Sequence, residues 1–547
     1  GPEVAVRMRV DEEFRVSGTL HALGDGNNPV QFFNTDNSEW SGIQAFDAAI
    51  VLHNTVIADA RAGLTATKSE GEINNCVFED NKTGVVLDHS KFEMYSNVIR
   101  ENNRGLRLQS SPAKLIGNSI EDNADYGVYS YRSSAFLKEN TLRYNRDGLV
   151  AINKSDHDLV VGRDASTPDV NNRIAENARY GVYIDDSSNP LLGYYEYNAG
   201  VGLYTGGFND FRPGNGDYDV YSEQPVTVDA RLNWWPNPPQ LAGNLTIEPT
   251  ARQLGLGKSV TTTNSKGDTI PVVLAEGIAL EVDSAFTEAS NQYTAFIEEN
   301  PASMYSRMAL AGLVRVSYKT NTESDLVPTL MMYHDQYAPE LVGLAALDYA
   351  ISVLVDVGEY EEALTQIGIL LPQYEAADTL AEETAAVIFE ELFVYYYLQE
   401  ISEGLGKMTQ EQIHERFNER LAVLVDQYGE TRSGELANTR YEDQLKEITD
   451  QLKIPQTTEL LPAYPNPFNP STTISYGLPE PGHVTLTVFD LTGRVIATLV
   501  NEQKEPGQYT VQWQGNNQYG HQVASGVYFY RFRADDITRV QKMMLIR

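Results

Sequence analysis

A column of polar and ionisable residues recurs five positions after a repeated glycine in the first half of this sequence. Its members are Lys68, His89, Ser110, Arg132, Asn153 and Asp186. Acids and bases at a defined separation are what an inverting glycosidase or a uronate lyase requires. Arg132, Asp186 and His89 are therefore the candidate catalytic residues. The alternative is an exposed polar turn, because turn residues meet water and no lyase signature accompanies the column.

A second column lies two positions after the same glycines and becomes aromatic toward one end. It contains Thr65, Val86, Arg107, Tyr129, Val150, Tyr183 and Tyr204. Tyrosine offers a flat apolar surface with a hydroxyl group, which suits stacking against sugar rings. The candidate ligand-binding residues are Tyr129, Tyr131, Tyr183, Tyr204 and Arg107. Tyrosine is also a good strand former, so a purely structural column is the alternative.

A longer interval of 33 residues separates Gly148 from Gly181, and the extra residues are expected to form a loop outside the repeat. Asp156, His157 and Asp158 lie in this insertion and carry metal-ligating groups. Three adjacent residues in one loop are a weak metal signal, and a solvated loop is the simpler interpretation. We predict no metal site and no cofactor, and nothing in the sequence decides whether the acidic surface binds calcium.

Both columns arise from one sequence repeat of mostly 21 or 22 residues. Glycines recur at intervals of 21, 21, 21, 22, 21, 33 and 21 residues, at Gly42, Gly63, Gly84, Gly105, Gly127, Gly148, Gly181 and Gly202. Apolar residues occupy the first position, and often the third, after each glycine, and a period of two indicates a strand. A unit of short strands and polar turns of this length predicts one coil of a parallel β-helix.

An asparagine precedes most of the glycines, at Asn54, Asn75, Asn97, Asn118, Asn140 and Asn172. Equivalent residues of a β-helix stack about 4.8 Å apart, so these side chains are expected to form a ladder of amide hydrogen bonds. The glycines are expected to adopt positive φ in a turn. Residues before Gly42 predict earlier coils, and Trp234 and Trp235 predict a plug at the open end of the solenoid.

Together these features resemble the right-handed parallel β-helix repeats of pectate-lyase-like and copper-maturation surface proteins, over residues 4 to about 240. The resemblance concerns the fold, and it implies little about chemistry.

Composition limits the remaining options. A chain of 547 residues is too long for one hydrophobic core and predicts about three or four domains. The net charge of -35 makes nucleic acid an improbable partner because phosphates would be repelled. Cys76 is the only cysteine, so an internal disulfide is excluded and the thiol is expected to pack as a small apolar group.

The middle of the chain, residues 276–453, is rich in Ala, Leu and Glu at helical spacings, with 33 acidic residues against 10 basic ones. It loosely resembles tetratricopeptide-like helical pairs, although the 34-residue period is not clean. Such arrays commonly offer a groove to a protein or peptide, so this part is predicted to bind a protein partner. A soluble spacer is the alternative.

The last segment predicts about six or seven short antiparallel strands, typical of a small β-sandwich. It begins with YPNPFNPSTTISYGLPE and continues through VFDLTGRVI and SGVYFYRF. These motifs resemble the type A C-terminal sorting domain of type IX secretion cargo, over residues 460–547. The resemblance implies recognition by the secretion machinery through Pro465, Asn466, Pro467, Phe468, Gly493, Arg494, Gly526, Tyr528, Lys542 and Arg547.

In that family the domain directs passage through the outer membrane and is then usually removed, so cleavage is expected around residues 457–462. The fixed prolines are expected to separate this domain from the preceding helices.

The predicted organisation is a multidomain chain: a right-handed parallel β-helix (1–250), a linker (251–275), an α-helical repeat-like domain (276–453), a second linker (454–463) and an immunoglobulin-like β-sandwich (464–547). The predicted function is non-catalytic binding of a glycan or protein on the outer cell surface of a didermal bacterium. A polysaccharide lyase or glycoside hydrolase and a structural component of a surface layer or fibre are the alternatives.

Overall fold

The computed structural model describes residues 4–546 except 10–11, 35–38, 160, 165–170, 186, 189, 194–195, 199–202, 224–227, 237, 248–270, 283, 378–379, 401–407, 442–443, 446–456, 505–506 and 535–536. The chain divides into two compact units, residues 1–408 and 409–547. Asp186, Arg547 and most of both predicted linkers lie outside the described residues.

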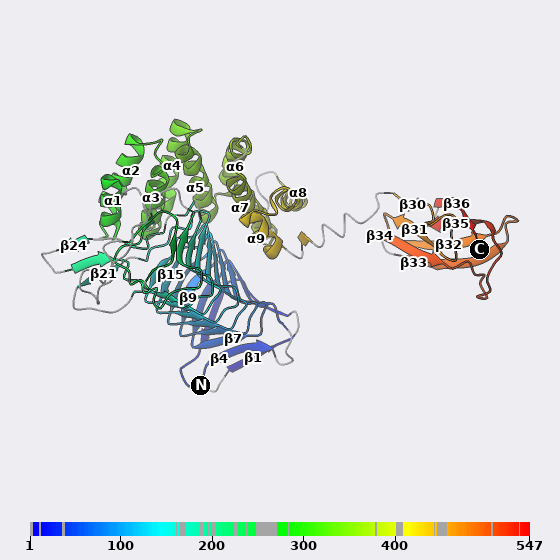
Figure 1. Cartoon of the computed structure of the whole chain (residues 1–547), viewed down its shortest axis with the longest axis horizontal. Coiled ribbons are helices and arrows are strands. Elements are labelled where there is room, and N and C mark those ends of the chain that lie inside the picture. Colours follow the sequence, from blue (N-terminus) through cyan, green and yellow to red (C-terminus); the bar gives the residue numbers. More distant parts are fainter. Residues whose placement is uncertain are drawn as a thin grey trace. The chain divides into compact units, whose positions relative to one another are not determined.

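The first unit begins with a parallel β-solenoid whose coils contribute strands to three sheets (Figure 1). The first sheet contains β1 (Val4–Met8), β4 (Val30–Asn34), β7 (Thr55–Ala58), β10 (Val77–Glu79), β13 (Val98–Arg100), β16 (Ser119–Glu121), β19 (Thr141–Arg143) and β22 (Arg173–Ala175). The second contains β2 (Glu13–Val16), β5 (Gly42–Phe46), β8 (Ala62–Thr67), β11 (Thr83–Asp88), β14 (Arg104–Gln109), β17 (Tyr126–Tyr131), β20 (Asp147–Ile152), β23 (Tyr180–Ile184), β26 (Tyr218–Ser222) and β28 (Leu241–Ala242). The third contains β3 (Thr19–Leu23), β6 (Ala49–His53), β9 (Glu70–Asn74), β12 (Lys91–Tyr95), β15 (Ala113–Ile116) and β18 (Phe136–Lys138).

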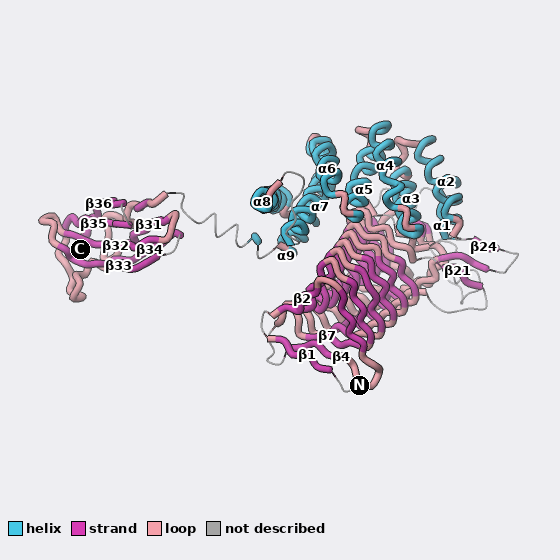
Figure 2. The backbone as a smooth tube through the Cα atoms, turned by 180° about the vertical axis from the view of Figure 1, so that it is seen from behind, coloured by secondary structure: helices cyan, strands magenta, loops and turns pink. Residues whose placement is uncertain are grey.

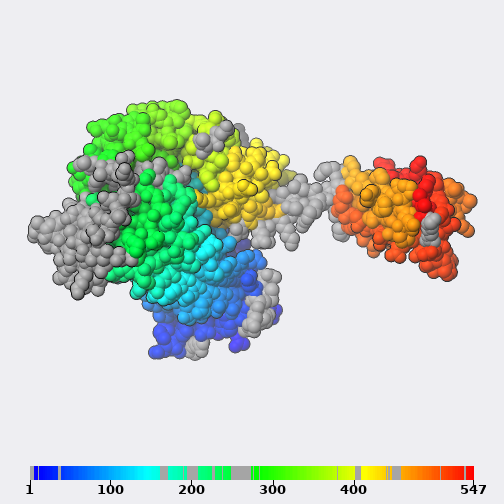
Figure 3. Space-filling view, in the orientation of Figure 1, coloured from blue at the N-terminus to red at the C-terminus, as the bar shows by residue number. Residues whose placement is uncertain are grey.

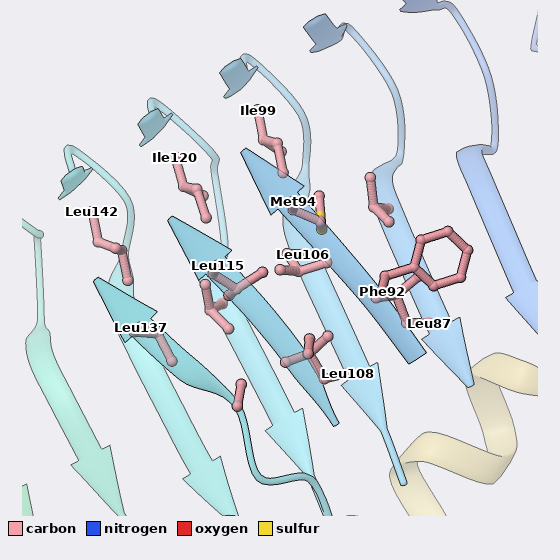
Figure 4. Packing of buried hydrophobic residues seen from close by; sticks show 14 of the residues in the cluster. Leu87, Phe92, Met94, Ile99, Leu106, Leu108, Leu115, Ile120, Leu137 and Leu142 are labelled. Atoms are coloured by element: carbon pink, nitrogen blue, oxygen red, sulfur yellow. The ribbon is translucent and has the colours of Figure 1, made fainter. Parts of the chain in front are cut away.

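The coils stack in register, so residues 21 or 22 positions apart lie side by side, as Val85 does with Leu64 and Leu106. In most of the described coils the apolar residues at the first and third positions after the glycine point inward and contribute to one continuous apolar core (Figure 4). The predicted parallel β-helix, including coils before Gly42, is confirmed. At the far end of the core Trp235 stacks on Phe211 with ring centroids 4.5 Å apart.

The repeated glycines are required for a different reason from the predicted one. Among those that the structure describes, only Gly42 has positive φ, at 96°. A Cβ on Gly127 would lie 2.8 Å from the carbonyl oxygen of Gly148 in the next coil, and Gly84 and Gly105 are crowded in the same way. The glycines therefore permit close approach of successive coils, while positive φ occurs at the turn residues, including Lys68, His89 and Arg132 at 48° to 50°.

Two asparagine ladders run through the solenoid, and sequence reasoning found only part of one. One ladder joins Asn97, Asn118, Asn140, Asn172, Asn209 and Asn233. The other joins Asn81, Asn102, Asn123, Asn145, Asn177 and Asn215. Asn54 and Asn75 were wrongly assigned, because both occupy a left-handed turn one residue before the ladder position. Cys76 takes that position in its coil and is fully buried.

The insertion after Gly148 also differs from its prediction. Asp158 remains in the stack, where it bridges Phe136 and Leu191 in neighbouring coils. Beyond it, β21 (Val161–Asp164) forms a separate antiparallel sheet with β24 (Glu196–Asn198) and β25 (Leu203–Gly206). Two short strands, β27 (Val228–Asp229) and β29 (Leu245–Thr246), pair near the end of the solenoid.

A layer of helices packs along one side of the solenoid in the same unit (Figures 2 and 3). It consists of α1 (Val272–Val282), α2 (Phe286–Glu299), α3 (Ser306–Thr320), α4 (Glu323–Tyr337), α5 (Leu341–Val357), α6 (Tyr360–Glu375) and α7 (Ala381–Glu400). Neighbouring helices in the sequence pack against each other, and α3 also contacts α5. In the part of the chain that is described, no helix is both long and apolar enough to cross a membrane.

The second unit contains α8 (Gln410–Tyr428), α9 (Arg432–Arg440) and a β-sandwich. One sheet comprises β30 (Glu459–Leu460), β31 (Thr472–Leu478) and β34 (Gly507–Trp513), and the other comprises β33 (Val495–Lys504), β32 (Gly482–Phe489), β35 (Gly526–Ala534) and β36 (Ile537–Leu545). This confirms the predicted antiparallel sandwich. The proposed cleavage segment 457–462 includes β30, whose Leu460 is buried in the sandwich core.

The proline-rich entry to the sandwich holds its last strand. The Asn466 amide oxygen accepts a hydrogen bond from the Met544 backbone N–H at 2.9 Å. The Phe468 N–H donates to the Met544 carbonyl at 2.9 Å, and its ring is buried beside Trp513. Of the remaining predicted signal residues, Tyr528 packs in the core and Lys542 is exposed.

Candidate functional site

The predicted catalytic column is buried beneath the helices. His89 Nδ1 lies 2.9 Å from Asp88 Oδ1 and its Nε2 lies 3.2 Å from Glu390 Oε2 on α7. The imidazole also stacks on Phe393 with ring centroids 3.5 Å apart. Only 3% of the His89 side chain is exposed, so the prediction that this turn is solvent-exposed is wrong here.

Arg132 occupies the corresponding turn two coils further along and binds two helices at once. Its Nη2 lies 2.6 Å from Asp348 Oδ1 on α5, and its Nε lies 2.9 Å from Glu390 Oε1 on α7. Ser110 adds a hydrogen bond to Glu390 at 2.9 Å, and Lys154 pairs with Asp348. Both candidate catalytic side chains that can be located therefore join the solenoid to the helices, and the third candidate, Asp186, lies outside the described residues.

We call the contact of His89, Ser110, Arg132 and Lys154 with α5 and α7 the seam. Its ion pairs determine the pKa values of the buried groups. Burial lowers the pKa of His89, but the Glu390 and Asp88 carboxylates outweigh it and raise the pKa to about 9. Burial raises the pKa of Glu390, but Arg132 and His89 outweigh it and lower the pKa to about 2. Both groups are therefore charged at neutral pH, and the seam is held by a network of opposite charges.

The spacing of helical turns allows α7 to contact several coils of the solenoid. Lys68, His89 and Arg132 face Tyr397, Phe393 and Glu390 respectively. One turn of an α-helix rises about 5.4 Å, while successive coils of a β-helix are about 4.8 Å apart. A helix that runs along the solenoid axis therefore presents roughly one side chain to each coil, and Glu390 serves two coils because it contacts both Ser110 and Arg132.

Sequence reasoning missed the helical half of this network. Asp348 and Glu390 are buried acids within the apolar runs VGLAALDYAISVLV and TAAVIFEELFVYYY. A buried carboxylate requires a charged or hydrogen-bonding partner. An acidic residue within an apolar helical run was therefore the signal that a buried partner exists. The sequence could not show which basic residue, more than two hundred positions away, supplies the partner.

The three adjacent residues with metal-ligating groups, Asp156, His157 and Asp158, have separate partners. Asp156 accepts a hydrogen bond from Tyr349 at 3.0 Å, and Asp158 pairs with Lys319 at 2.9 Å. His157 is fully buried, and burial lowers its pKa to about 4. No group of three or more His, Cys, Asp or Glu side chains in the described parts of the chain is arranged to hold a metal ion.

Exposed tyrosines do stack on the second sheet, but the residues involved differ from the predicted set. Tyr183 stacks on Tyr221 with ring centroids 5.7 Å apart and an interplanar angle of 6°. Tyr180 and Tyr218 adjoin them at centroid distances of 5.4 to 6.2 Å. All four side chains are partly exposed on β23 and β26. We call Tyr180, Tyr183, Tyr218 and Tyr221 the tyrosine cluster.

Tyr204 does not belong to this cluster, because its backbone pairs with Arg163 and Tyr197 in the separate antiparallel sheet. The coil after β23 begins at Tyr218 and has Asp219 where the repeat predicts glycine, so the spacing rule failed there. The recurrence of Tyr-x-Val-Tyr at residues 180–183 and 218–221 was the signal that could have found it.

The other predicted binding residues divide between exposed and buried positions. Tyr129 is partly exposed and packs against Tyr126 at 5.0 Å, two coils from Tyr183. Arg107, next to Tyr129 in register, is mostly buried. Tyr131 is fully buried and packs edge-on against Phe389 of α7, so it belongs to the seam and not to an exposed surface.

Two open clefts follow the seam. One has a volume of about 450 Å³ and lies between β12, β15, β18 and α3. The other, of about 650 Å³, continues past Lys68 and His89 to the ends of α5, α6 and α7. Both are lined by Lys91, Pro112 and Tyr318, so they meet at these residues and form one groove.

Comparisons with known protein families give matches for the β-solenoid and for the C-terminal β-sandwich. Residues 22–165 match the family described as right handed beta helix region, and residues 468–536 match the FlgD Ig-like domain. The N-terminal fold is therefore a right-handed β-helix and the C-terminal fold is immunoglobulin-like. No curated protein matches the chain.

Two solved structures align with parts of the chain. One is PorZ, a surface component of the type IX secretion system of Porphyromonas gingivalis, at 26% identity over 16% of this chain and 11% of that one, with a TM-score of 0.13. The other is the alkylpurine DNA glycosylase AlkC of Pseudomonas fluorescens, at 12% identity over 50% of this chain and 96% of that one, also with a TM-score of 0.13. These TM-scores are too low for either structure to inform the function of this chain.

Proposed function

We propose that this chain is a surface protein of a didermal bacterium, exported by type IX secretion, whose solenoid binds a glycan without cleaving it. The observation that carries the binding proposal is the tyrosine cluster. Its four rings lie on adjacent coils, are partly exposed and pack in parallel or tilted pairs. Such a surface offers both apolar area and hydroxyl groups to sugar rings.

Tyr129 lies on the same sheet as the cluster, two coils away, with Val150 at the equivalent position between them. The coils that carry β17, β20, β23 and β26 are consecutive in that sheet, so the tyrosines span about 14 Å at roughly 4.8 Å per coil. Arg179 stacks over Tyr180 at 4.5 Å and pairs with Asp147, which fixes a guanidinium at the margin of the cluster. This arrangement favours an extended chain of several sugars over a single small molecule.

The use of His89 and Arg132 in the seam is the main argument against the lyase or hydrolase alternative. Their charges are opposed by Asp88, Asp348 and Glu390, and their side chains are 3% and 2% exposed. A general base must reach the proton that it removes, and groups held in such ion pairs are poorly placed for that role.

The export part of the proposal rests on the sequence motifs of residues 464–547 together with the sandwich fold. Lys542 and Arg494 are exposed and accessible to a receptor, whereas Phe468 and Tyr528 maintain the core. Since β30 belongs to the sandwich, we propose that removal of the domain occurs before Glu459, which shifts the predicted cleavage toward the preceding linker.

The binding proposal is tested with the double variant Tyr183→Ala, Tyr221→Ala in the full chain. Retention on polysaccharide affinity gels should fall at least tenfold, because stacking of one sugar on one ring contributes roughly 1 kcal/mol. Tyr144→Ala is the matched control, since Tyr144 is 45% exposed on the solenoid but outside the cluster. Equal retention of the double variant and the parent would refute the role of the tyrosine cluster.

A further inference from the structure

The groove between the solenoid and the helices is distinct from the tyrosine cluster. Its solenoid wall contains residues from seven successive coils, including Thr19, Lys68, His89, Pro112 and Asp158. At about 4.8 Å per coil this wall is about 29 Å long. The groove is therefore long enough for a segment of an extended polymer.

Its opposite wall is formed by helices. Arg315, Tyr318 and Lys319 come from α3, and Tyr360 and Tyr397 come from α6 and α7. The groove has partly exposed aromatic surface at both ends, with Phe136 of β18 at one end and Tyr360 of α6 at the other. Polar side chains lie between these surfaces.

Two buried polar atoms in the groove have no hydrogen-bond partner in the protein. Arg315 is held by Glu281 through its Nε and Nη2 atoms at 3.0 and 2.9 Å, but its buried Nη1 has no hydrogen-bond partner. Asp356 accepts a hydrogen bond from Tyr318 at 2.5 Å through Oδ2, and its buried Oδ1 has no partner. An unsatisfied buried polar atom costs roughly 1–3 kcal/mol, so a ligand that supplies one acceptor and one donor would stabilise both.

Burial also shifts the pKa values of two ionisable groups in the groove, Asp356 and Lys68. Burial raises the pKa of Asp356, although His89 and Lys68 oppose the shift. Burial likewise lowers the pKa of Lys68, against the opposing effect of Asp356. Both shifts weaken the preference of these two groups for their charged forms.

The charge of the groove argues against an acidic ligand. Among the described residues that line it, seven carry carboxylates and six carry cationic groups: Asp47, Glu70, Glu93, Asp156, Asp158, Glu323 and Asp356 against Lys68, His89, Lys91, Lys114, Arg315 and Lys319. Several of these are already paired within the groove walls, as Lys91 is with Glu323 at 2.9 Å and Lys319 with Asp158. A polyanion would therefore gain little attraction, whereas hydroxyl groups could bond to charges of either sign.

The backbone argues against an extended peptide. Along this wall the backbone N–H groups of Lys68, His89 and Ser110 donate to the carbonyls of residues 88, 109 and 131 in the next coil. The solenoid therefore offers no open strand edge there with which a peptide backbone could pair. A polyhydroxylated chain needs no such edge because its hydroxyl groups bond to side chains.

We infer that this groove binds a neutral polysaccharide chain, laid along the solenoid axis between the β-helix and helices α3 to α7. The inference rests on the proposed glycan-binding function and names a second site for it. Arg315 and Asp356 are its central hydrogen-bonding residues, and the aromatic surfaces at the two ends receive sugar rings. An extended peptide and an acidic polysaccharide are the competing occupants.

The test uses isothermal titration calorimetry of the full chain with linear neutral β-glucan and mannan oligosaccharides of two to six sugars. Affinity should rise with chain length and exceed that for oligogalacturonates of equal length. Ser134→Trp places a large side chain in the groove, because Ser134 lines it between the solenoid and α3 and makes no ion pair. This variant should weaken binding at least tenfold.

Lys138→Trp is the matched control, since Lys138 ends the neighbouring strand β18 and does not line the groove. It should bind as the parent does, and circular dichroism should show that both variants remain folded. If Ser134→Trp binds normally while Tyr183→Ala, Tyr221→Ala does not, the groove inference is wrong and the proposed function stands. If no neutral oligosaccharide binds at millimolar concentration, or if the acidic ones bind more tightly, the groove inference also fails.

Discussion

Arg132 on the solenoid lies 2.6 Å from Asp348 on α5, with 2% and 0% of their side chains exposed. The two residues are 216 positions apart in the chain, and each has a second buried charged partner: Glu390 for Arg132 and Lys154 for Asp348. This buried network makes the β-helix and helices α1 to α7 one compact unit and leaves a groove beside it.

Arg132→Ala should destabilise that unit by about 3–5 kcal/mol, because it leaves Asp348 and Glu390 buried with less compensation. Thermal unfolding measures the loss, and hydrogen exchange should accelerate in α5 and α7 specifically. Arg146→Ala is the control, since Arg146 is 51% exposed in a surface pair with Asp125 and should contribute at most about 1 kcal/mol. Equal effects of the two substitutions would contradict the structural role of Arg132.

The seam should weaken in alkali. The folded pKa of His89 is about 9, against an ordinary value of 6.5, so its charge contributes stability that is complete below pH 6.5. That stability is lost as the pH rises through about 9, and the loss is on the order of 3 kcal/mol. Urea unfolding followed by tryptophan fluorescence between pH 6 and 10 measures it.

His89→Gln removes the titrating group and keeps a hydrogen-bonding side chain. The difference in stability between parent and variant should shrink as the pH rises from 6.5 to 9.5. A difference that stays constant over this range would show that His89 is not charged in the folded protein.

Gly127→Ala tests the close approach of coils. A Cβ there would lie 2.8 Å from the Gly148 carbonyl oxygen and 2.9 Å from the Asn145 amide, so the coils would have to separate. We expect a loss of about 1–3 kcal/mol, typical of overpacking in a closely packed interior. Gly26→Ala should be nearly neutral because no atom lies within 4 Å of its added Cβ. A neutral Gly127→Ala would contradict close approach of the coils as the reason for this glycine.

Phe468→Ala tests the entry segment of the sandwich. The Phe468 ring is buried beside Trp513, and its truncation should cost about 3–5 kcal/mol. In a host with type IX secretion, surface display of a reporter fused to residues 454–547 should fall accordingly. Tyr464→Ala is the control, because Tyr464 is 81% exposed. Normal folding and display of the Phe468 variant would contradict the importance of this contact.

The fold was predictable where the pattern repeats. The 21-residue spacing and the period-two alternation identified the coils, and alternation with turn residues identified the sandwich. The register beyond β23 was not predictable, because Asp219 replaces the expected glycine and the intervening residues form a separate sheet. Local spacing carries no information about where an inserted segment ends.

The candidate site was less predictable than the fold. Alternation correctly placed Tyr129 and Tyr183 on the outer face of the second sheet, but Tyr131 was assigned to an exposed surface that α7 covers. Which solenoid face the helices cover depends on charge pairs between residues hundreds of positions apart, such as His89 with Glu390. A single sequence does not specify such pairs.

The central claim is that the solenoid unit binds a glycan and does not cleave it. The most direct measurement incubates the full chain with neutral and acidic polysaccharides and records both retention on the polymer and release of reducing ends or unsaturated products. The account predicts retention without new chain ends. New chain ends, or the absence of retention on every polysaccharide, would contradict it.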